Sequence, residues 1–283
     1  IDSEAVESFR YEAKASFTYK LRYVNNSGSF EEYFQIGGRK GKKKAPDRAV
    51  VGSFQSIPLS NCAKDSNMTA LSTVSTNLPL IAVLTAATSR NEPFPSIKKM
   101  SLFTLMLPSL MRSLDCGFRY VVVIGYDVGD FYFDKQQGMI YMWFDKIQTK
   151  MQRRGIAISL EMVRVDNAIK KPGPVFIEIA RKAYDMGAEF MYRVNDDTEF
   201  HGRWPKLYAH TLMGLTKPYG VVGPRSTTTQ NRILTHDFVH RTHMEIFKQV
   251  YYPVELVDWW MDDWISSVYG INRTFMSKDV TVT

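Results

Sequence analysis

The chain has 283 residues, of which 45% are hydrophobic, 13% aromatic and 23% charged. These proportions are those of a folded globular protein, and they exclude intrinsic disorder, a collagen-like repeat and a disulfide-stapled miniprotein as descriptions of the whole chain. The formal net charge is +7, but residues 39–48 (RKGKKKAPDR) contain six basic residues and one acid. Because the positive charge is concentrated in one short tract, a nucleic-acid-binding face built into the fold is not favoured.

Residues 1–78 predict an irregular or partly β-stranded N-terminal extension, because Tyr- and Phe-rich stretches alternate with clusters of Gly, Ser, Asn and Lys. The basic run at 39–44 is typical of a mobile solvated loop, with nucleic acid, anionic lipid or an acidic acceptor as alternative contacts. The acceptor triplets at Asn25, Asn67 and Asn272 favour the ER or Golgi lumen weakly over the cytoplasm. The chain begins with Ile, so the expected membrane contact is an N-terminal anchor preceding it.

From residue 79 the pattern predicts alternating strands and helices. Strands are expected at 78–87, 119–127, 159–166 and 189–196, and helices at 96–115, 135–153 and 174–187. Further on, a helix is expected at 204–216, short strands near 220–223 and 233–239, and helices near 241–250 and 258–268. This order is typical of a doubly wound α/β sheet, whose ligands bind at the carboxyl ends of the strands.

The segment with most chemical content is Asn195-Asp196-Asp197, which directly follows the fourth expected strand. Two carboxylates and an amide at a strand end repel one another unless a cation is present. Oxygen ligands of this kind suit Mg²⁺ or Mn²⁺, which commonly bridge to substrate phosphates. The alternative is an acidic loop in which Asp197 or Thr198 caps a following helix.

This turn resembles the DxD-type motif of nucleotide-sugar glycosyltransferases with the GT-A fold. The resemblance lies in motif order and topology and covers residues 79–283, with Asn195 in place of the first Asp. It implies a GT-A-like doubly wound mixed sheet with flanking helices, a nucleotide-sugar-binding half (79–200) and an acceptor-side half (201–283). It also implies that Asp197 binds the metal directly, while Asp196 and Asn195 contact the nucleotide ribose or the metal hydration shell.

A second acidic group, Asp258-Trp259-Trp260-Met261-Asp262-Asp263-Trp264, opens an expected apolar helix. A partly desolvated carboxylate there would have a raised pKa, which suits a general base. The aromatic faces suit the apolar faces of a sugar ring. Inverting GT-A enzymes are similar in placing a pair of acids late in the chain at a helix start. The alternative is a helix capped by Asp258, with its Trp residues in the core.

Weaker signals lie at the other strand ends. Arg90 follows the first strand and is a candidate diphosphate contact, and Asp127 at the end of the second could accept from the base or ribose. Lys171 precedes a helix and could place a cation near the phosphates. For each, the alternative is a residue of a solvated loop or turn. Histidines in THDFVHRTH (235–243) raise zinc as a weak alternative, because the third ligand and the helix register are missing.

The sequence thus predicts a metal-dependent glycosyltransferase that moves a sugar from a nucleotide-diphosphate donor, most simply a UDP-sugar, to a hydroxyl of a glycan, a protein or another acceptor. Mn²⁺ or Mg²⁺ would be the cofactor, and Asp263 or its neighbour Asp262 the base if the reaction inverts. The alternative is a non-catalytic nucleotide-sugar or glycan binding module on the same fold.

Overall fold

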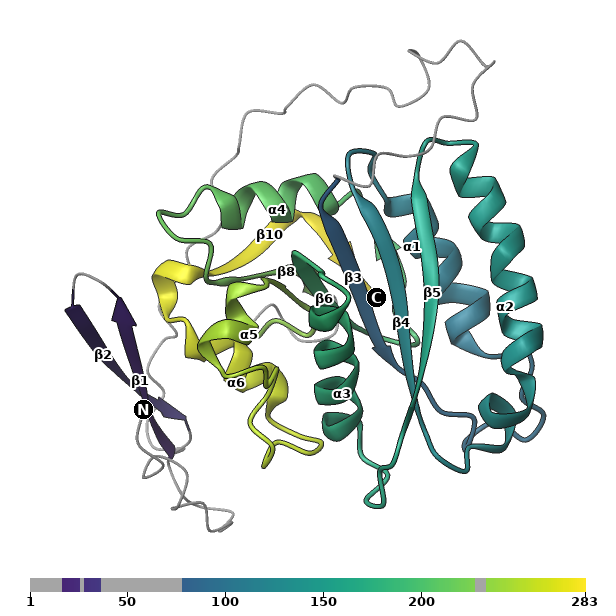
Figure 1. Cartoon of the computed structure of the whole chain (residues 1–283), viewed down its shortest axis with the longest axis horizontal. Helices are drawn as coiled ribbons and strands as arrows, with labels where there is room; N and C mark the ends of the chain where they lie inside the picture. The colour runs from purple at the N-terminus through teal and green to yellow at the C-terminus, as the bar shows by residue number, and fades with distance from the viewer. Residues whose placement is uncertain (1–16, 26–27, 37–77, 227–232) are drawn as a thin grey trace.

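The computed structural model describes residues 17–25, 28–36, 78–226 and 233–283 (Figure 1). In the N-terminal part, β1 (Phe17–Asn25) and β2 (Gly28–Ile36) pair as an antiparallel hairpin. The rest of the predicted extension, including the basic tract at 39–48, lies outside the described residues.

The remaining strands form one eight-stranded sheet. Its first half contains four parallel strands: β3 (Leu80–Ala86), β4 (Arg119–Asp127), β5 (Ala157–Val165) and β6 (Phe190–Asn195). Its second half contains β7 (Phe200–His201), β8 (Val221–Ser226), β9 (Asp237–His240) and β10 (Thr274–Val282). The spatial order is β5-β4-β3-β6-β9-β8-β10-β7, with β9 antiparallel to both of its neighbours. The predicted mixed α/β sheet is therefore confirmed.

Helices cover both faces of this sheet (Figure 1). One face packs against α1 (Leu107–Ser113), α2 (Phe131–Gln152) and α4 (Pro205–Met213). The other packs against α3 (Pro172–Asp185), α5 (Thr242–Ile246) and α6 (Met261–Val268). Two short elements complete the set, the π-helical turn η2 (Leu102–Met106) and the 3₁₀ turn η3 (Ile271–Arg273).

Strand β3 shows why helices must pack on both faces of the sheet. Ile81 and Val83 belong to the core on the α1 side, whereas Leu80, Ala82 and Leu84 belong to the core on the α3 side. Successive side chains of a strand point to opposite faces, so a continuous apolar run is stable only between two layers of helices. Burying each large apolar side chain contributes about 1.5–3 kcal/mol.

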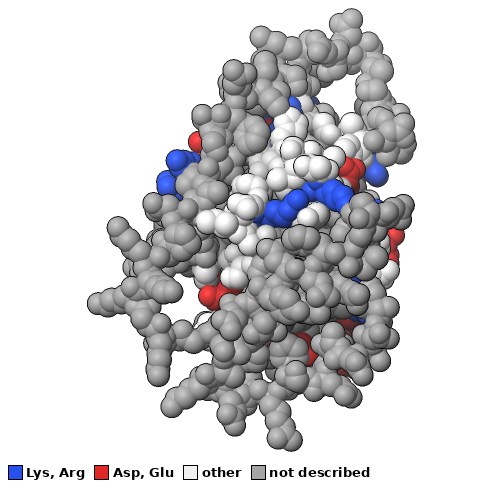
Figure 2. Space-filling model, turned by 90° about the vertical axis from the view of Figure 1, so that its left-hand side faces the viewer, with Lys and Arg blue, Asp and Glu red and all other residues white. Residues whose placement is uncertain are grey.

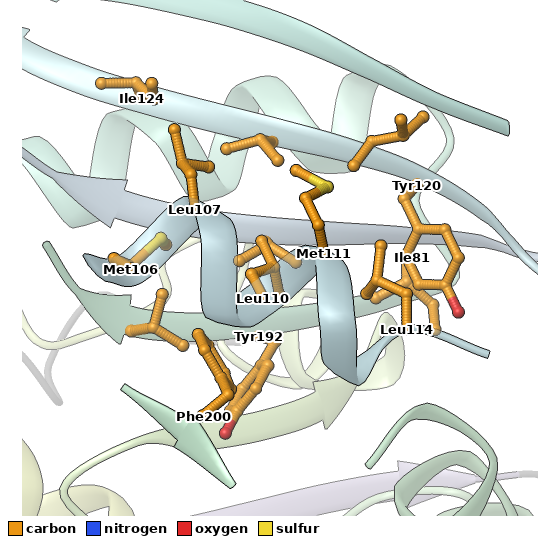
Figure 3. Close-up of a cluster of buried hydrophobic side chains, with 14 of the residues drawn as sticks. Ile81, Met106, Leu107, Leu110, Met111, Leu114, Tyr120, Ile124, Tyr192 and Phe200 are labelled. Carbon is orange, nitrogen blue, oxygen red and sulfur yellow. The ribbon is translucent and has the colours of Figure 1, made fainter. Parts of the chain in front are cut away.

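Helix α1 connects the two halves of the sheet on its own face. Figure 3 shows Leu107, Leu110 and Met111 pointing from α1 into the cluster that also contains Tyr192 of β6 and Phe200 of β7. Ser109 of the same helix accepts a hydrogen bond from the backbone N–H of Phe200 at 3.1 Å. Helix α1 therefore contacts both strands that flank the turn between β6 and β7.

The opposite face requires a glycine at position 125. A Cβ atom built at Gly125 would lie 2.4 Å from Cγ1 of Val175 and 2.6 Å from Cγ2 of Ile179. Both contacts are far shorter than van der Waals distance, so the missing side chain lets α3 lie directly against the end of β4. This close packing places the start of α3 beside the loop that follows β4.

The charge distribution on the surface and the apolar character of the helices complete the description of the fold. Figure 2 shows that the described part of one side of the molecule is mostly uncharged, with a short row of basic side chains and scattered acids. Among the described residues, no helix combines the length and the apolar character that crossing a membrane requires.

Candidate active site

The carboxyl ends of three neighbouring strands lie level with one another. Ala86 of β3 pairs with Gly125 of β4 on one side and with Asn195 of β6 on the other. The segments that leave these strands therefore start at the same edge of the sheet, as the sequence predicted. In open α/β sheets this edge is where ligands bind.

The loop after β3 is fixed by a buried carboxylate at the start of α2. Asp130 accepts hydrogen bonds from the backbone N–H of Ser89 at 2.8 Å and from its hydroxyl at 2.6 Å. The same carboxylate caps α2 by accepting from the N–H of Phe133 at 3.3 Å. These bonds hold the neighbouring residue, Arg90, at the edge of the sheet.

Two predicted donor-side residues, Arg90 and Asp127, are in direct contact. The Arg90 guanidinium pairs with Oδ2 of Asp127, and Nδ2 of Asn167 donates to Oδ1 of the same carboxylate at 2.7 Å. The Asp127 side chain is only 5% exposed, whereas that of Arg90 is 41% exposed. The Arg90 guanidinium thus faces solvent at the edge of the sheet, while Asn167 holds the buried carboxylate of its partner Asp127.

Lys171 pairs with an acid from the far end of the chain. Its Nζ lies 2.5 Å from Oδ2 of Asp258. The backbones meet here too, because the N–H of Gly173 donates to the carbonyl of Val257 at 2.8 Å. Asp258 does not cap the following helix: α6 begins at Met261 after Trp260, so the alternative of a helix cap at Asp258 is wrong. The ion pair with Lys171 fixes Asp258 at the start of α3 instead.

The acidic turn after β6 is open to ligands. Asn195 and Asp197 are exposed and Asp196 is half-buried. Burial raises the pKa of Asp196 to about 6, and the negative charge of Asp197 adds to this effect. No helix follows, because the chain enters β7 and α4 begins only at Pro205, so the alternative of a helix cap at Asp197 or Thr198 is wrong.

A buried guanidinium lies directly behind this turn. Arg193, two residues before Asn195, donates through Nη1 to Oδ1 of Asn195 at 3.5 Å. Its Nε donates to Oδ2 of Asp237 at 2.8 Å, and its Nη2 pairs with Oδ1 of Asp262. One side chain therefore joins the acidic turn to the first turn of α6.

The two candidate base residues lie in that first turn. Asp262 and Asp263 are both half-buried. Burial raises the pKa of the Asp262 carboxyl, against the opposing effect of the Arg193 charge. The structure thus brings Asp262, Arg193 and Asn195 together, and it places Asp263 next to them in the chain.

The three tryptophans of this segment have different environments. Trp264 is 2% exposed and packs in the core, whereas Trp259 is 78% and Trp260 is 59% exposed. Trp260 also has a φ of 74°, in the left-handed region that bulky residues rarely adopt. The alternative that the tryptophans fill the core holds for Trp264 alone.

The histidines of segment 235–243 are engaged within the protein. A ring nitrogen of His236 lies 2.6 Å from the Thr198 hydroxyl. The ring of His243 lies between the Tyr269 hydroxyl at 2.6 Å and the Tyr251 carbonyl at 2.8 Å. These contacts account for the orientations of the two rings. Burial lowers the pKa of His236 to about 3 and that of His243 to about 4.

The donor set of the acidic turn fits a divalent cation shared with a diphosphate. Within the described ranges, no group of three or more His, Cys, Asp or Glu side chains is arranged to enclose a metal ion. Mg²⁺ is commonly held by only one or two carboxylates together with substrate phosphates. Asp197 and Asp196 supply such carboxylates, and the repulsion between them is what a bound cation would relieve.

Sequence reasoning missed four residues of this site: Arg193, Asp237, Asn167 and Asp258 in its pairing role. A usable signal existed for Arg193, because it is the one charged residue in the otherwise apolar strand segment FMYRV. A charge in a buried strand needs a buried partner, which Asp237 supplies. Asn167 and Asp258 gave no comparable signal, since polar residues are ordinary in loops.

No protein-family model and no curated protein sequence matches the chain. Among solved structures, the chain is similar to S. aureus TarS with 14% identity and a TM-score of 0.47, over 71% of this chain and 36% of that one. It is similar to residues 1–349 of TarS in complex with UDP at 15% identity and a TM-score of 0.47, over 71% and 59% of the two chains. The chain therefore spans less than two thirds of the length of each of these structures.

Proposed function

We propose that this chain is a metal-dependent glycosyltransferase that moves a sugar from a nucleotide-diphosphate donor to an acceptor hydroxyl, with UDP-sugars as the donor class. The observation that carries the proposal is the bridge from Asn195 through Arg193 to Asp262. This bridge holds the exposed acidic turn and the half-buried carboxylate of Asp262 close together, which supports the assignment of a cation site and a base to one edge of the sheet.

The donor would bind across the ends of β3, β4 and β6. Arg90 offers an exposed guanidinium for the diphosphate, and Asp127 behind it keeps that guanidinium in place. Asp197 would hold Mn²⁺ or Mg²⁺ directly, and Asp196 would contact the nucleotide ribose or the hydration shell of the metal. When bound, this cation would stabilise the negative charge of the leaving diphosphate. Asn195 would contact the ribose or the hydration shell of the metal.

The acceptor would approach from the α6 side. Asp262 is 34% exposed at its side chain, so its carboxylate can reach a solvent-borne hydroxyl. A carboxylate with a raised pKa accepts a proton more readily at neutral pH, which is what a general base requires. Asp263, one residue on, is the alternative base. Trp259 and Trp260 offer exposed aromatic faces for the apolar faces of an acceptor sugar.

The test is turnover of a panel of nucleotide sugars with Mn²⁺, read as donor hydrolysis and as transfer to glycan acceptors. The proposal predicts turnover of at least one UDP-sugar that is abolished by EDTA and by Asp197→Asn. Asp185→Asn is the matched control, because Asp185 is exposed at the far end of α3 and makes the same charge change. Binding without turnover by any donor would favour the binding-module alternative, and unchanged turnover in EDTA would exclude the metal role.

A further inference from the structure

Arg193 makes more ionic contacts than its own burial requires. Its side chain is 3% exposed, and an unpaired charge at such a position is strongly unfavourable. Asp237, whose side chain is fully buried, pairs with this charge: its Oδ2 lies 2.8 Å from Nη2 of Arg193. Asp237 is itself held by the hydroxyls of Tyr251 at 2.6 Å and Tyr252 at 2.7 Å.

The pair of Arg193 and Asp237 is therefore already balanced in charge. A further carboxylate, Asp262, adds a second negative charge to the same guanidinium. Neutralising Arg193 does not explain this contact, because one carboxylate suffices. The side chain of Asp262 is also ten times more exposed than that of Arg193, 34% against 3%, and could have turned to solvent.

The geometry of the guanidinium explains what the second contact achieves. Its Nε and Nη1 are held by groups of the β6–β9 side, including the Thr235 carbonyl at 2.8 Å from Nη1. Nη2 contacts Asp237 as well as Asp262, so the guanidinium plane that Asp237 and Thr235 fix also sets the direction of the contact with Asp262. A planar fork of donors transmits a fixed angle from one partner to the next, which a lysine ammonium cannot do.

We propose that Arg193 is a positioning residue that sets the place of the Asp262 carboxylate relative to Asn195 and the acidic turn. This inference rests on the proposed function, since it assigns Arg193 a task in the same site. Arg193 contacts neither donor nor acceptor. It acts through Asn195 on the donor side and Asp262 on the acceptor side.

The experiment compares Arg193→Lys with Tyr120→Phe. The lysine keeps the positive charge for Asp237 but cannot contact Asn195, Asp237 and Asp262 together. Tyr120→Phe removes the buried hydrogen bond that the Tyr120 hydroxyl donates to the Asp115 carbonyl at 2.6 Å. Tyr120 belongs to the core on the α1 side, away from Arg193 and its partners, so this variant reports the effect of lost stability alone. For each variant we would measure thermal unfolding, the Kd for UDP with Mn²⁺, and kcat for the best donor.

For Arg193→Lys the expected result is a fall in kcat of about 100-fold, the scale of a displacement of about 1 Å in a catalytic group, with less than about a fivefold change in the Kd for UDP. Tyr120→Phe should lower stability and keep kcat. A wild-type kcat in Arg193→Lys, or an equal loss in the two variants at equal loss of stability, would overturn the positioning role.

A second measurement covers the case in which Arg193→Lys does not fold. Asn195 and Asp262 lie at the solvent edge, so Asn195→Ala, Asp262→Ala and the double variant should fold. If Arg193 links the two, removing the second side chain should cost about tenfold less in single-turnover rate than removing it from the wild type. Independent, multiplicative losses would overturn the link. A wild-type chain that turns over no donor would overturn the proposed function and this role with it, whereas active wild type with multiplicative losses would overturn this role alone.

Discussion

The carboxylate of Asp262 combines three properties of a general base: partial burial, a raised pKa and access to solvent. In the proposed mechanism the ionised form of Asp262 accepts the proton, so activity should be lost as the pH falls through its pKa. That loss should occur at a higher pH than the ordinary value for an aspartate, since burial raises this pKa.

The corresponding experiment is a profile of kcat against pH for the wild type and for Asp262→Asn. The amide cannot accept the proton, so kcat should fall by about 10²–10⁴-fold and the acidic limb should disappear. A variant with near-normal kcat would transfer the base role to Asp263. Asp263→Asn, measured in parallel, distinguishes the two assignments.

Trp259 allows a separate prediction about the acceptor. Its indole is 78% exposed, so its replacement removes little buried area. Trp259→Ala should raise the acceptor KM with small effects on kcat and on the melting temperature. Val254→Ala is the control, because Val254 is 61% exposed on the same loop and has no aromatic face. An unchanged acceptor KM in Trp259→Ala would remove this residue from the acceptor side.

At the scale of elements, the contact between α3 and the segment before α6 brings the proposed donor and acceptor sides together. A Cβ atom on Gly173 would lie 2.3 Å from the carbonyl oxygen of Leu256, which is backbone and cannot move away cheaply. Gly173→Ala should therefore push apart the two segments that carry Lys171 and Asp258.

We expect Gly173→Ala to lower the free energy of unfolding by about 1–3 kcal/mol, the range for overpacking, and to weaken UDP binding. The control is Gly138→Ala in α2, where an added Cβ meets no atom within 4 Å. That change should leave binding unaltered and stabilise the helix by up to about 1 kcal/mol. Chemical denaturation and calorimetry measure both effects, and equal behaviour of the two variants would contradict this explanation.

The bounds of the elements also show how much of the fold could be predicted from the sequence. Strand β4 was predicted with its observed bounds, because an apolar run ending at Gly125-Tyr126-Asp127 defines a buried strand and its end. The helix expected at 96–115 is shorter: helical structure begins at η2, from Leu102, and ends at Ser113. Local periodicity does not show where tertiary packing ends a helix.

The candidate site likewise contains residues that could be predicted from the sequence and contacts that could not. Positions that depend on strand ends, such as Asp127 and Asn195, were predictable because the fold places all parallel strand ends at one edge. Partnerships between distant segments were not. The pairing of Lys171 with Asp258 joins residues 87 apart in the chain, and it depends on how α3 and α6 pack.

At the scale of the whole molecule, two buried histidines make stability depend on pH. Burial lowers the pKa of His236 to about 3 and that of His243 to about 4. Between these values and the ordinary value near 6.5, the unfolded chain binds protons that the folded chain does not. Stability should therefore be complete above about pH 6.5 and fall as the pH drops below it, by up to about 1.4 kcal/mol per pH unit for each histidine.

Denaturant unfolding between pH 4.5 and 7.5 measures this slope. His243→Gln should reduce it, because the amide does not titrate, although the loss of the ring contacts with Tyr251 and Tyr269 will also lower stability at pH 7.5. A slope that is the same in the variant and the wild type would mean that His243 does not contribute to it.

The central claim is that the turn after β6 binds a nucleoside diphosphate through a divalent cation. Calorimetric titration of UDP into the wild-type chain, with and without Mn²⁺, tests it most directly, with Asp197→Asn and the control Asp185→Asn titrated alongside. We predict binding by the wild type and Asp185→Asn that requires Mn²⁺, and its loss in Asp197→Asn. UDP binding that is equally tight without Mn²⁺, or unaffected by Asp197→Asn, would contradict the account.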